Sequence, residues 1–156
     1  MTQKKPFIVK KNSGAAKHEC HGEFEYHKRL ILPRPGNQCT VAIMEIPPLK
    51  TAYPCHYHQA VTEVFYIISG LGKLETPDGD HQVTAGDVII FPPGPDGAHK
   101  IWNASASEPL VYFDCDTVAP ADVVHYPHSG KVGMIVNGTP TAYHRNADAV
   151  TYYDGE

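Results

Sequence analysis

Prolines and glycines divide the whole chain into short runs. The 14 prolines and 13 glycines separate segments rich in valine, isoleucine, phenylalanine and tyrosine, and no longer segment keeps a convincing helical period. Proline disrupts a helix and glycine weakens one, whereas both are common in the turns between strands. The pattern therefore predicts an all-β protein of many short antiparallel strands, closed into a barrel or a jelly roll.

The central part of the chain contains the clearest strand signals. Each run ends in a turn sequence such as Pro77–Asp80 or Ala85–Asp87. We expect strands at the following positions: Gln38–Ile46, Val64–Ser69, Gly72–Thr76, His81–Thr84, Val88–Phe91, His99–Asn103 and Leu110–Asp116.

The length favours one domain, with a barrel core over residues 38–116 and an extension on each side. We expect residues 1–37 to pack on the barrel and residues 117–156 to complete or cover it. Candidate strands in these extensions are Phe7–Val9, Arg29–Leu32, Val123–Val124, Val132–Val136 and Ala149–Tyr153. Bare sheet edges promote aggregation, so we expect the extensions to cover edges and an edge strand to join two copies in a homodimer.

The composition excludes several classes of protein. A net charge of −4 argues against nucleic-acid binding, which normally needs a basic stripe. No apolar run approaches the roughly 20 residues that span a membrane. The four cysteines include no CxxC pair, and no secretory signal is visible. We therefore expect reduced thiols and a cytoplasmic location, with no nucleic-acid or membrane partner.

Three histidines and one glutamate form the strongest candidate site. His56 and His58 lie two residues apart, so on a strand their side chains point to the same side. Glu63 opens the next expected strand and His99 opens a later one, and antiparallel strands can bring all four to one barrel mouth. Imidazole and carboxylate groups bind divalent transition metals, so we predict a metal site made by these four residues.

The spacing around the first three candidates resembles the first motif of the cupin superfamily. That motif is Gly, five residues, His-x-His, three or four residues, Glu, six residues, Gly. Here four residues separate His58 from Glu63, and six separate Glu63 from Gly70. The leading glycine is replaced by Lys50, a position in a turn.

The second cupin motif also resembles this sequence. It is Gly, five residues, Pro-x-Gly, two residues, His, three residues, Asn. Here five residues follow Gly86, then come Pro92 and Gly94, and His99 and Asn103 follow in order. The stretch from Gly94 to His99 is two residues longer than the pattern.

The resemblance implies a double-stranded β-helix (jelly-roll) barrel in which His56, His58, Glu63 and His99 bind a divalent metal. Mn, Fe, Ni and Zn are the expected cofactors, and Cu and Co also occur in the superfamily. Three neutral imidazoles and one carboxylate leave an octahedral ion two open positions for water or a small-molecule substrate. Because imidazole must be deprotonated to bind, we predict metal loss below roughly pH 6.

Two functions stay open at this point. The first is a metal-dependent enzyme on a small organic acid or sugar, of oxygenase, decarboxylase or isomerase type. The second is a non-catalytic ligand-binding or sensing module that uses the metal to anchor a carboxylate. A structural or storage role is disfavoured, because such barrels tend to lose their ligands. Arg29, Arg34 and Arg145 lie outside both motifs, which lowers the expectation of a phosphosugar substrate.

Other reactive side chains are weaker candidates. Asp114 and Asp116 alternate with Tyr112 on an expected strand, and we interpret them as rim residues in preference to general acids or bases. Lys100 should face away from the metal. The rest are interpreted as structural: Tyr57 and Tyr66 in the core, Trp102 outside the barrel, Cys55 facing away from the ligands, His18–His21 as polar surface, and His125, His128 and His144 as surface or packing residues.

Overall fold

The computed structural model describes residues 5–10, 13 and 16–156 of the chain. These residues form strands and two short 3-10 helices, Pro95–Gly97 and Asn146–Asp148. The strands are β1 (Lys17–His21), β2 (Phe24–Leu32), β3 (Cys39–Ile46), β4 (Tyr57–His58), β5 (Glu63–Ser69), β6 (Leu71–Thr76), β7 (Gly79–Thr84), β8 (Val88–Phe91), β9 (Lys100–Asn103), β10 (Leu110–Thr117), β11 (Ala121–Tyr126), β12 (Lys131–Val136) and β13 (Thr139–Arg145). The protein is therefore all-β, as the sequence predicts.

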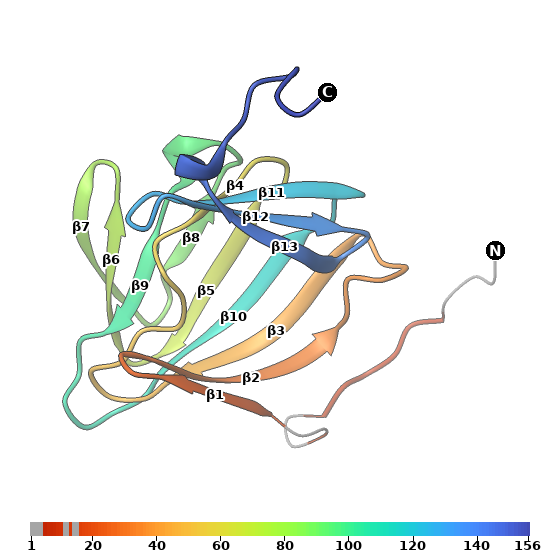
Figure 1. Ribbon diagram of the computed structural model, residues 1–156. Helices are drawn as coiled ribbons and strands as arrows, with labels where there is room; N and C mark the ends of the chain where they lie inside the picture. Colours follow the sequence, from red (N-terminus) through yellow and green to blue (C-terminus); the bar gives the residue numbers. More distant parts are fainter. Residues whose placement is uncertain (1–4, 11–12, 14–15) are drawn as a thin grey trace.

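Three antiparallel sheets build the molecule. The largest has the strand order β1-β2-β3-β10-β5-β8, and a three-stranded sheet has the order β7-β6-β9. The third sheet, β13-β12-β11-β4, joins the C-terminal strands to the short strand that carries His58. Figure 1 shows β11, β12 and β13 crossing above one end of β3, β5 and β10. The third sheet thus covers one mouth of the barrel that the other two enclose.

One apolar core fills the space between the first two sheets. Its buried side chains come from both of them: Ala42, Met44 and Ile46 on β3, Phe65 and Ile67 on β5, Leu74 on β6, Val83 on β7, Phe91 on β8, Ile101 on β9, and Leu110 and Tyr112 on β10, with Ala52 from the loop before β4. Burying a large apolar side chain contributes about 1.5–3 kcal/mol to folding. The closed core is the frame that positions the polar residues at the mouth.

Strand β10 shows how alternation sets the boundary between core and site. Leu110 and Tyr112 are fully buried and point into the barrel, and the next inward positions are Asp114 and Asp116. Successive inward residues lie about 7 Å apart along a strand, because each residue advances the chain by about 3.4 Å. The strand therefore changes from an apolar core at one end to a charged cavity at the other.

The turn between β5 and β6 requires glycine. Gly70 has a φ of 95°, and a Cβ atom there would lie 2.5 Å from the carbonyl oxygen of Pro109. Only glycine adopts this backbone without strain. The glycine that closes the first motif thus permits the close approach of two chain segments.

The central strand predictions agree with the structure to within about two residues. In the extensions, β2 begins at Phe24, well before the expected Arg29, while β1 and β13 were not expected. Phe7–Val9 and Ala149–Tyr153 are not strands, so the prediction that they could be strands is wrong. Their apolar side chains are largely exposed, so no core contact stabilises a strand there. Among the described residues, no helix is long and apolar enough to cross a membrane.

Candidate metal centre

Strand ends from three parts of the chain meet at the barrel mouth. His56 precedes β4 and exchanges two backbone hydrogen bonds with His99, at 3.1 and 2.9 Å. His58 ends β4, and Glu63 begins β5. Because His56 and His58 are two residues apart on extended backbone, their rings project to the same side. The structure brings the four predicted ligands together.

The donor atoms of these residues converge on Glu63. The Nε2 atoms of His56 and His58 lie 3.9 and 3.6 Å from its carboxylate oxygens, and Nε2 of His99 lies at 3.4 Å. His56, His58 and Glu63 offer donor atoms that all lie within 4.8 Å of one another, which is close enough to hold one metal ion. All four side chains are buried.

Each histidine is held in the tautomer that leaves Nε2 free. Nδ1 of His56 lies 2.9 Å from the carbonyl oxygen of Pro54, and Nδ1 of His99 lies 2.9 Å from that of Gly97. A carbonyl oxygen only accepts, so both Nδ1 atoms must carry the proton. Nδ1 of His58 donates in the same way to the carboxylate of Asp122. Bonds of this kind orient metal-binding imidazoles.

The Nε2 atom of His99 provides the clearest test of whether a metal fits. It is buried and has no hydrogen-bond partner among the described residues. A buried polar atom without a partner costs about 1–3 kcal/mol. The donors that all lie within 4.8 Å of one another are those of His56, His58 and Glu63, without His99. A cation held by these three residues would lie next to the unpartnered nitrogen, because Nε2 of His99 is 3.4 Å from Glu63. The donor set fits a divalent transition metal.

Burial favours the neutral imidazoles of His56 and His99 and the protonated form of Glu63 in the absence of a cation. It lowers the pKa of His56 to about 4, with the neighbouring His58 acting in the same direction. Burial, followed by His56, also lowers the pKa of His99 well below its usual value. Burial, followed by Asp116 and Asp114, raises the pKa of Glu63 well above its usual value. The neutral imidazoles are ready to bind a metal, and the cation would have to displace the proton of Glu63.

A small cavity of about 170 Å³ opens beside the ligands. It is lined by His56, His58 and Glu63 together with charged, aromatic and apolar side chains: Lys28, Arg34, Tyr53, Pro54, Phe65, Asp114, Asp116, Val124, Tyr126 and Ile135. Strands β2, β10, β11 and β12 therefore all contribute to it. The cavity size suits a small polar molecule, since drug-sized ligands need about 300 Å³ or more.

Asp114 and Asp116 are buried in this cavity and do not lie on an exposed rim, which corrects the interpretation made from the sequence. Lys28 Nζ lies 3.4 Å from Asp114, and Arg34 Nη2 lies 2.9 Å from Asp116. Burial, followed by the nearby Asp114, raises the pKa of Asp116 to about 8, although Arg34 and Lys28 act in the opposite direction. A carboxyl group that titrates near neutral pH is suited to transferring protons.

Three charged residues of this site are not indicated by the sequence. Lys28, Arg34 and Asp122 lie outside the two motifs, and none stands in a pattern that indicates a buried position. Arg34 also shows that an arginine outside the motifs can still point into the barrel. Asp122 was detectable only as one polar residue in an otherwise apolar run.

The other candidates lie away from the cavity. Tyr66 is 45% exposed, so its placement in the core is wrong. Tyr57 is half-buried and stacks on His125 with ring centroids 4.6 Å apart. Trp102 lies beneath the ammonium of Lys73 on the outer side of β9. Lys100 also faces outward, with its ammonium 3.8 Å from Glu23.

Cys55 and the segment His18–His21 also do not line the cavity beside His56 and His58. Burial, followed by Glu75, raises the pKa of the Cys55 thiol to about 11, which makes it a poor nucleophile. The segment His18–His21 forms β1, where His18 stacks on His27. In the described part of the chain, no group of three metal-binding side chains includes this segment.

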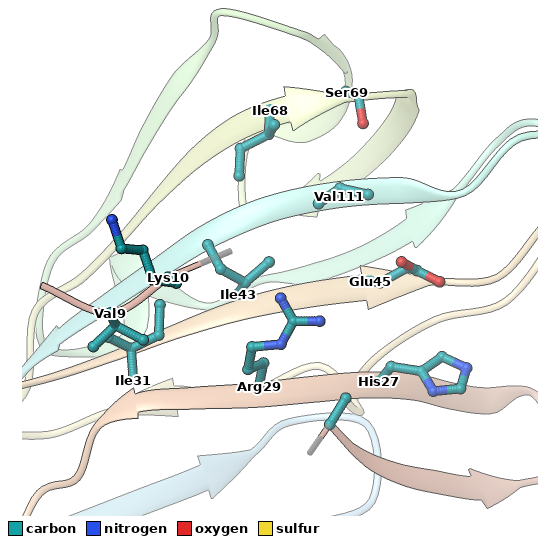
Figure 2. Close-up of a pocket in the computed structure, with 11 residues that line it drawn as sticks. Val9, Lys10, His27, Arg29, Ile31, Ile43, Glu45, Ile68, Ser69 and Val111 are labelled. Carbon is teal, nitrogen blue, oxygen red and sulfur yellow. The ribbon is translucent and has the colours of Figure 1, made fainter. Parts of the chain in front are cut away.

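A larger cavity of about 700 Å³ lies on the outer face of the six-stranded sheet. Figure 2 shows Ile31, Ile43, Val111 and Ile68 along it, with the side chain of Arg29 between them. These residues alternate with the inward positions of β2, β3, β10 and β5, so the cavity and the histidines lie on opposite faces of the sheet. Size alone does not identify the chemical site.

Comparison with known proteins agrees with the geometry. Residues 42–116 match the cupin domain family. A sugar phosphate isomerase candidate from Acidithiobacillus ferrooxidans is similar in structure, with a TM-score of 0.77, 22% identity and coverage of 92% of this chain and 95% of that one. A sugar phosphate isomerase from Silicibacter pomeroyi has a TM-score of 0.70 at 19% identity and covers 83% and 82% of the two chains.

A predicted oxalate decarboxylase from Thermotoga maritima is also similar, with a TM-score of 0.62, 18% identity and coverage of 72% of this chain and 100% of that one. No curated protein sequence matches the chain. At these identities the solved structures establish the fold alone. Residues 42–116 thus match the cupin domain family, and the chain is similar in fold to these three structures.

Proposed function

We propose that this protein is a metal-dependent enzyme acting on a small polar substrate, an organic acid or a sugar. The observation that carries the proposal is the meeting of three imidazole Nε2 atoms and Glu63 beside a cavity of about 170 Å³ that also holds Asp116. His56, His58, Glu63 and His99 would bind Mn, Fe, Ni or Zn. When bound, the metal supplies a Lewis acid that polarises an oxygen atom of the substrate.

The residues of the cavity define what the chain itself would do. Asp116, with its pKa near 8, would exchange a proton with the substrate. Arg34 and Lys28 pair with the two aspartates. Below the pKa of Asp116 the two cations face at most one charged aspartate, and the remaining positive charge favours an anionic substrate over a neutral one. The apolar side chains of Val124 and Ile135 also line the cavity. Proton transfer beside a polarised oxygen is the chemistry of isomerases and decarboxylases, classes that also occur among the structures with this fold.

A second function is supported by the same positive charges. Lys28 and Arg34 beside the metal ligands would suit a non-catalytic module that anchors a carboxylate ligand on the metal. The two functions differ in whether Asp116 contributes to turnover. Both need the metal, so metal content is the first property to measure.

Metal content after purification tests the site itself. We expect the wild-type protein to carry a divalent transition metal, and His58→Ala to carry about one equivalent less, because one of four ligands is lost. His125→Ala is the matched control, since His125 stacks on Tyr57 near the site but does not line the cavity. Equal metal content in wild type and His58→Ala would refute the site.

Turnover separates the enzyme from the binding module. Metal-free protein would be loaded with Fe²⁺ under anaerobic conditions and screened for oxygen consumption, and with Mn²⁺, Ni²⁺ or Zn²⁺ for decarboxylation or isomerisation of small acids and sugars. For an enzyme with Asp116 as proton donor or acceptor, Asp116→Asn should lower kcat by roughly 10²–10⁴ without loss of metal. Tight carboxylate binding without turnover in any of these assays would favour the binding module.

A further inference from the structure

A second group of metal-binding side chains lies next to β4, on the side opposite the first site. Cys55 precedes β4, Glu75 lies on β6, and His128 lies in the turn between β11 and β12. One donor atom from each residue lies within 4.8 Å of the others. His128 Nε2 is 2.7 Å from Glu75 Oε1, and the Cys55 side chain is buried beside them.

This group is separate from the first site. Cys55 and His56 are adjacent on extended backbone, so their side chains point in opposite directions. The residues around Cys55 line a different cavity, of about 390 Å³, which shares no lining residue with the cavity beside His56 and His58. The two sites would thus lie on opposite sides of the chain segment that contains Cys55 and His56.

The ligand types at this second position differ from those of the first site. A thiolate, an imidazole and a carboxylate form a donor set that favours zinc, because sulfur is a soft ligand. A thiolate and a carboxylate would neutralise a divalent ion, whereas the single carboxylate of the first site leaves it positively charged. Three protein ligands leave a fourth tetrahedral position, which here would open into the cavity lined by Tyr57, Pro77 and Pro95.

The nearby lysine does not block this position. Lys100 is the cross-strand partner of Glu75. Its ammonium lies 3.8 Å from Glu23 and 5.6 Å from the centre of the Phe24 ring, so it already has partners. The Glu75 carboxylate contacts His128 instead, on the side where Cys55 lies.

We propose that Cys55, Glu75 and His128 bind a second divalent metal, zinc by ligand preference, with one coordination position open to the cavity. The ion would tie the turn between β11 and β12 to β6 and so brace the sheet that covers the barrel mouth. The proposal does not depend on the function proposed for the first site. The competing interpretation is a simple ion pair between His128 and Glu75 beside an uninvolved thiol.

Cobalt spectroscopy distinguishes the two sites because only the second contains sulfur. Metal-free full-length protein would be titrated with Co²⁺ under reducing conditions. We expect a sulfur-to-cobalt charge-transfer band in the near ultraviolet, which added Zn²⁺ removes. The four ligands of the first site cannot produce this band. Its absence from the wild-type protein would overturn the proposal.

Variants assign the band to the residues. Cys55→Ser should abolish it, and Cys115→Ser, which changes a partly buried cysteine on β10, should leave it unchanged. His128→Ala should weaken Co²⁺ binding at this site at least tenfold and is safe for folding, since the His128 side chain is 60% exposed. A band that persists in Cys55→Ser, or that is as strong and as tightly bound in His128→Ala as in wild type, would refute the assignment.

The first site serves as an internal reference in the same experiment. His58→Ala should remove cobalt from the first site and keep the sulfur band. If that variant lost the band as well, the sulfur ligand would belong to a shared site and the second site would be refuted. If cobalt still bound but the sulfur band did not appear, the second site would be refuted. The function proposed for the first site would be unaffected.

Discussion

Asp122 accepts the Nδ1 proton of His58, and its other oxygen accepts the backbone N–H of Ala60 at 2.9 Å. Burial opposes its ionisation, but the hydrogen bonds from His58 and Ala60 hold the pKa of Asp122 below its usual value. The lowered pKa favours the ionised carboxylate, which is the form that accepts the hydrogen bond from His58 Nδ1. Its role is to fix the ring that presents Nε2 to the site.

We expect Asp122→Ala to lower metal affinity by about 10–100-fold, because it releases His58 from its orientation. Competition against a chelator measures this loss. Asp80→Ala is the control, since Asp80 is an exposed carboxylate paired with Lys73. A loss of equal size in both variants would show that the effect is not specific to His58.

Metal retention should depend on pH through the ligands themselves. The pKa of Glu63 is raised, first by burial, so in the metal-free protein this carboxyl holds a proton at pH values where a free glutamate is ionised. Protons therefore compete with the metal at Glu63 as the pH falls through that pKa, whereas the lowered pKa values of His56 and His99 keep these two imidazoles neutral to lower pH.

We expect metal occupancy to fall below roughly pH 6 and to return when the pH is raised. The lowered pKa of His56, about 4, works in the other direction and limits the loss that this one ligand contributes. Dialysis at a series of pH values, followed by metal analysis, measures the profile. The same occupancy at pH 5 as at pH 7.5 would contradict the expectation.

At the scale of the elements, Asn103 joins three chain segments. Its amide donates to the carbonyl oxygens of Ile46 at 2.9 Å and Glu108 at 2.8 Å, and its Oδ1 accepts the backbone N–H of Ser105 at 2.9 Å. Asn103 is fully buried. The asparagine that ends the second motif thus fixes the end of β3 and the turn between β9 and β10, and it is not a metal ligand.

Asn103→Ala should lower the free energy of unfolding by about 2–5 kcal/mol, since it leaves buried backbone groups without partners. Denaturant unfolding in the presence of a chelator measures the change without a contribution from metal. Asn146→Ala, at an exposed position, should stay within about 0.5 kcal/mol of wild type. A loss at Asn103 no greater than that at Asn146 would exclude the role given to this side chain.

The positions of Lys28 on β2 and Asp122 on β11 show why part of the site could not be predicted from the sequence. The core strands are short runs rich in valine, isoleucine, phenylalanine and tyrosine between turn residues, and the two motifs carry their ligands at short, recognisable spacings. In β2, the inward Lys28 looks like any surface lysine, because its sequence neighbours are also polar. The pairing of β2 with β3 determines which side chains of β2 point inward. This pairing cannot be read from the residues next to Lys28 in the sequence.

At the scale of the whole molecule, an apolar patch remains exposed on the outer face of the six-stranded sheet. Tyr66 and Ile68 on β5 and Val88 and Ile90 on β8 are between 44% and 64% exposed. Tyr66 is directly opposite Val88, so the patch is continuous across the two strands. Strand β8 is also an edge of that sheet, where a second chain could pair.

The homodimer remains a prediction, with this patch and the β8 edge as the interface between two copies of the chain. Light scattering during size-exclusion chromatography should give the mass of a dimer for wild type and of a monomer for Ile90→Lys, since a lysine would place a charge in the apolar contact. Met134→Lys, at a residue 44% exposed on a different sheet, should remain a dimer. The mass of a monomer for the wild-type protein at micromolar concentration would refute the proposed homodimer.

The sequence by itself determined the all-β class, most of the central strands and the four residues that meet at the barrel mouth. These follow from short β-prone runs between turn residues and from short motif spacings, both of which involve only a few neighbouring residues. The tertiary structure alone decided the rest of the site. Asp122 lies 64 residues from His58, Arg34 lies 82 from Asp116, and Lys28 lies 86 from Asp114. Contacts over such separations depend on how whole strands pair and pack, so the charge balance around the metal ligands appears only in the folded chain.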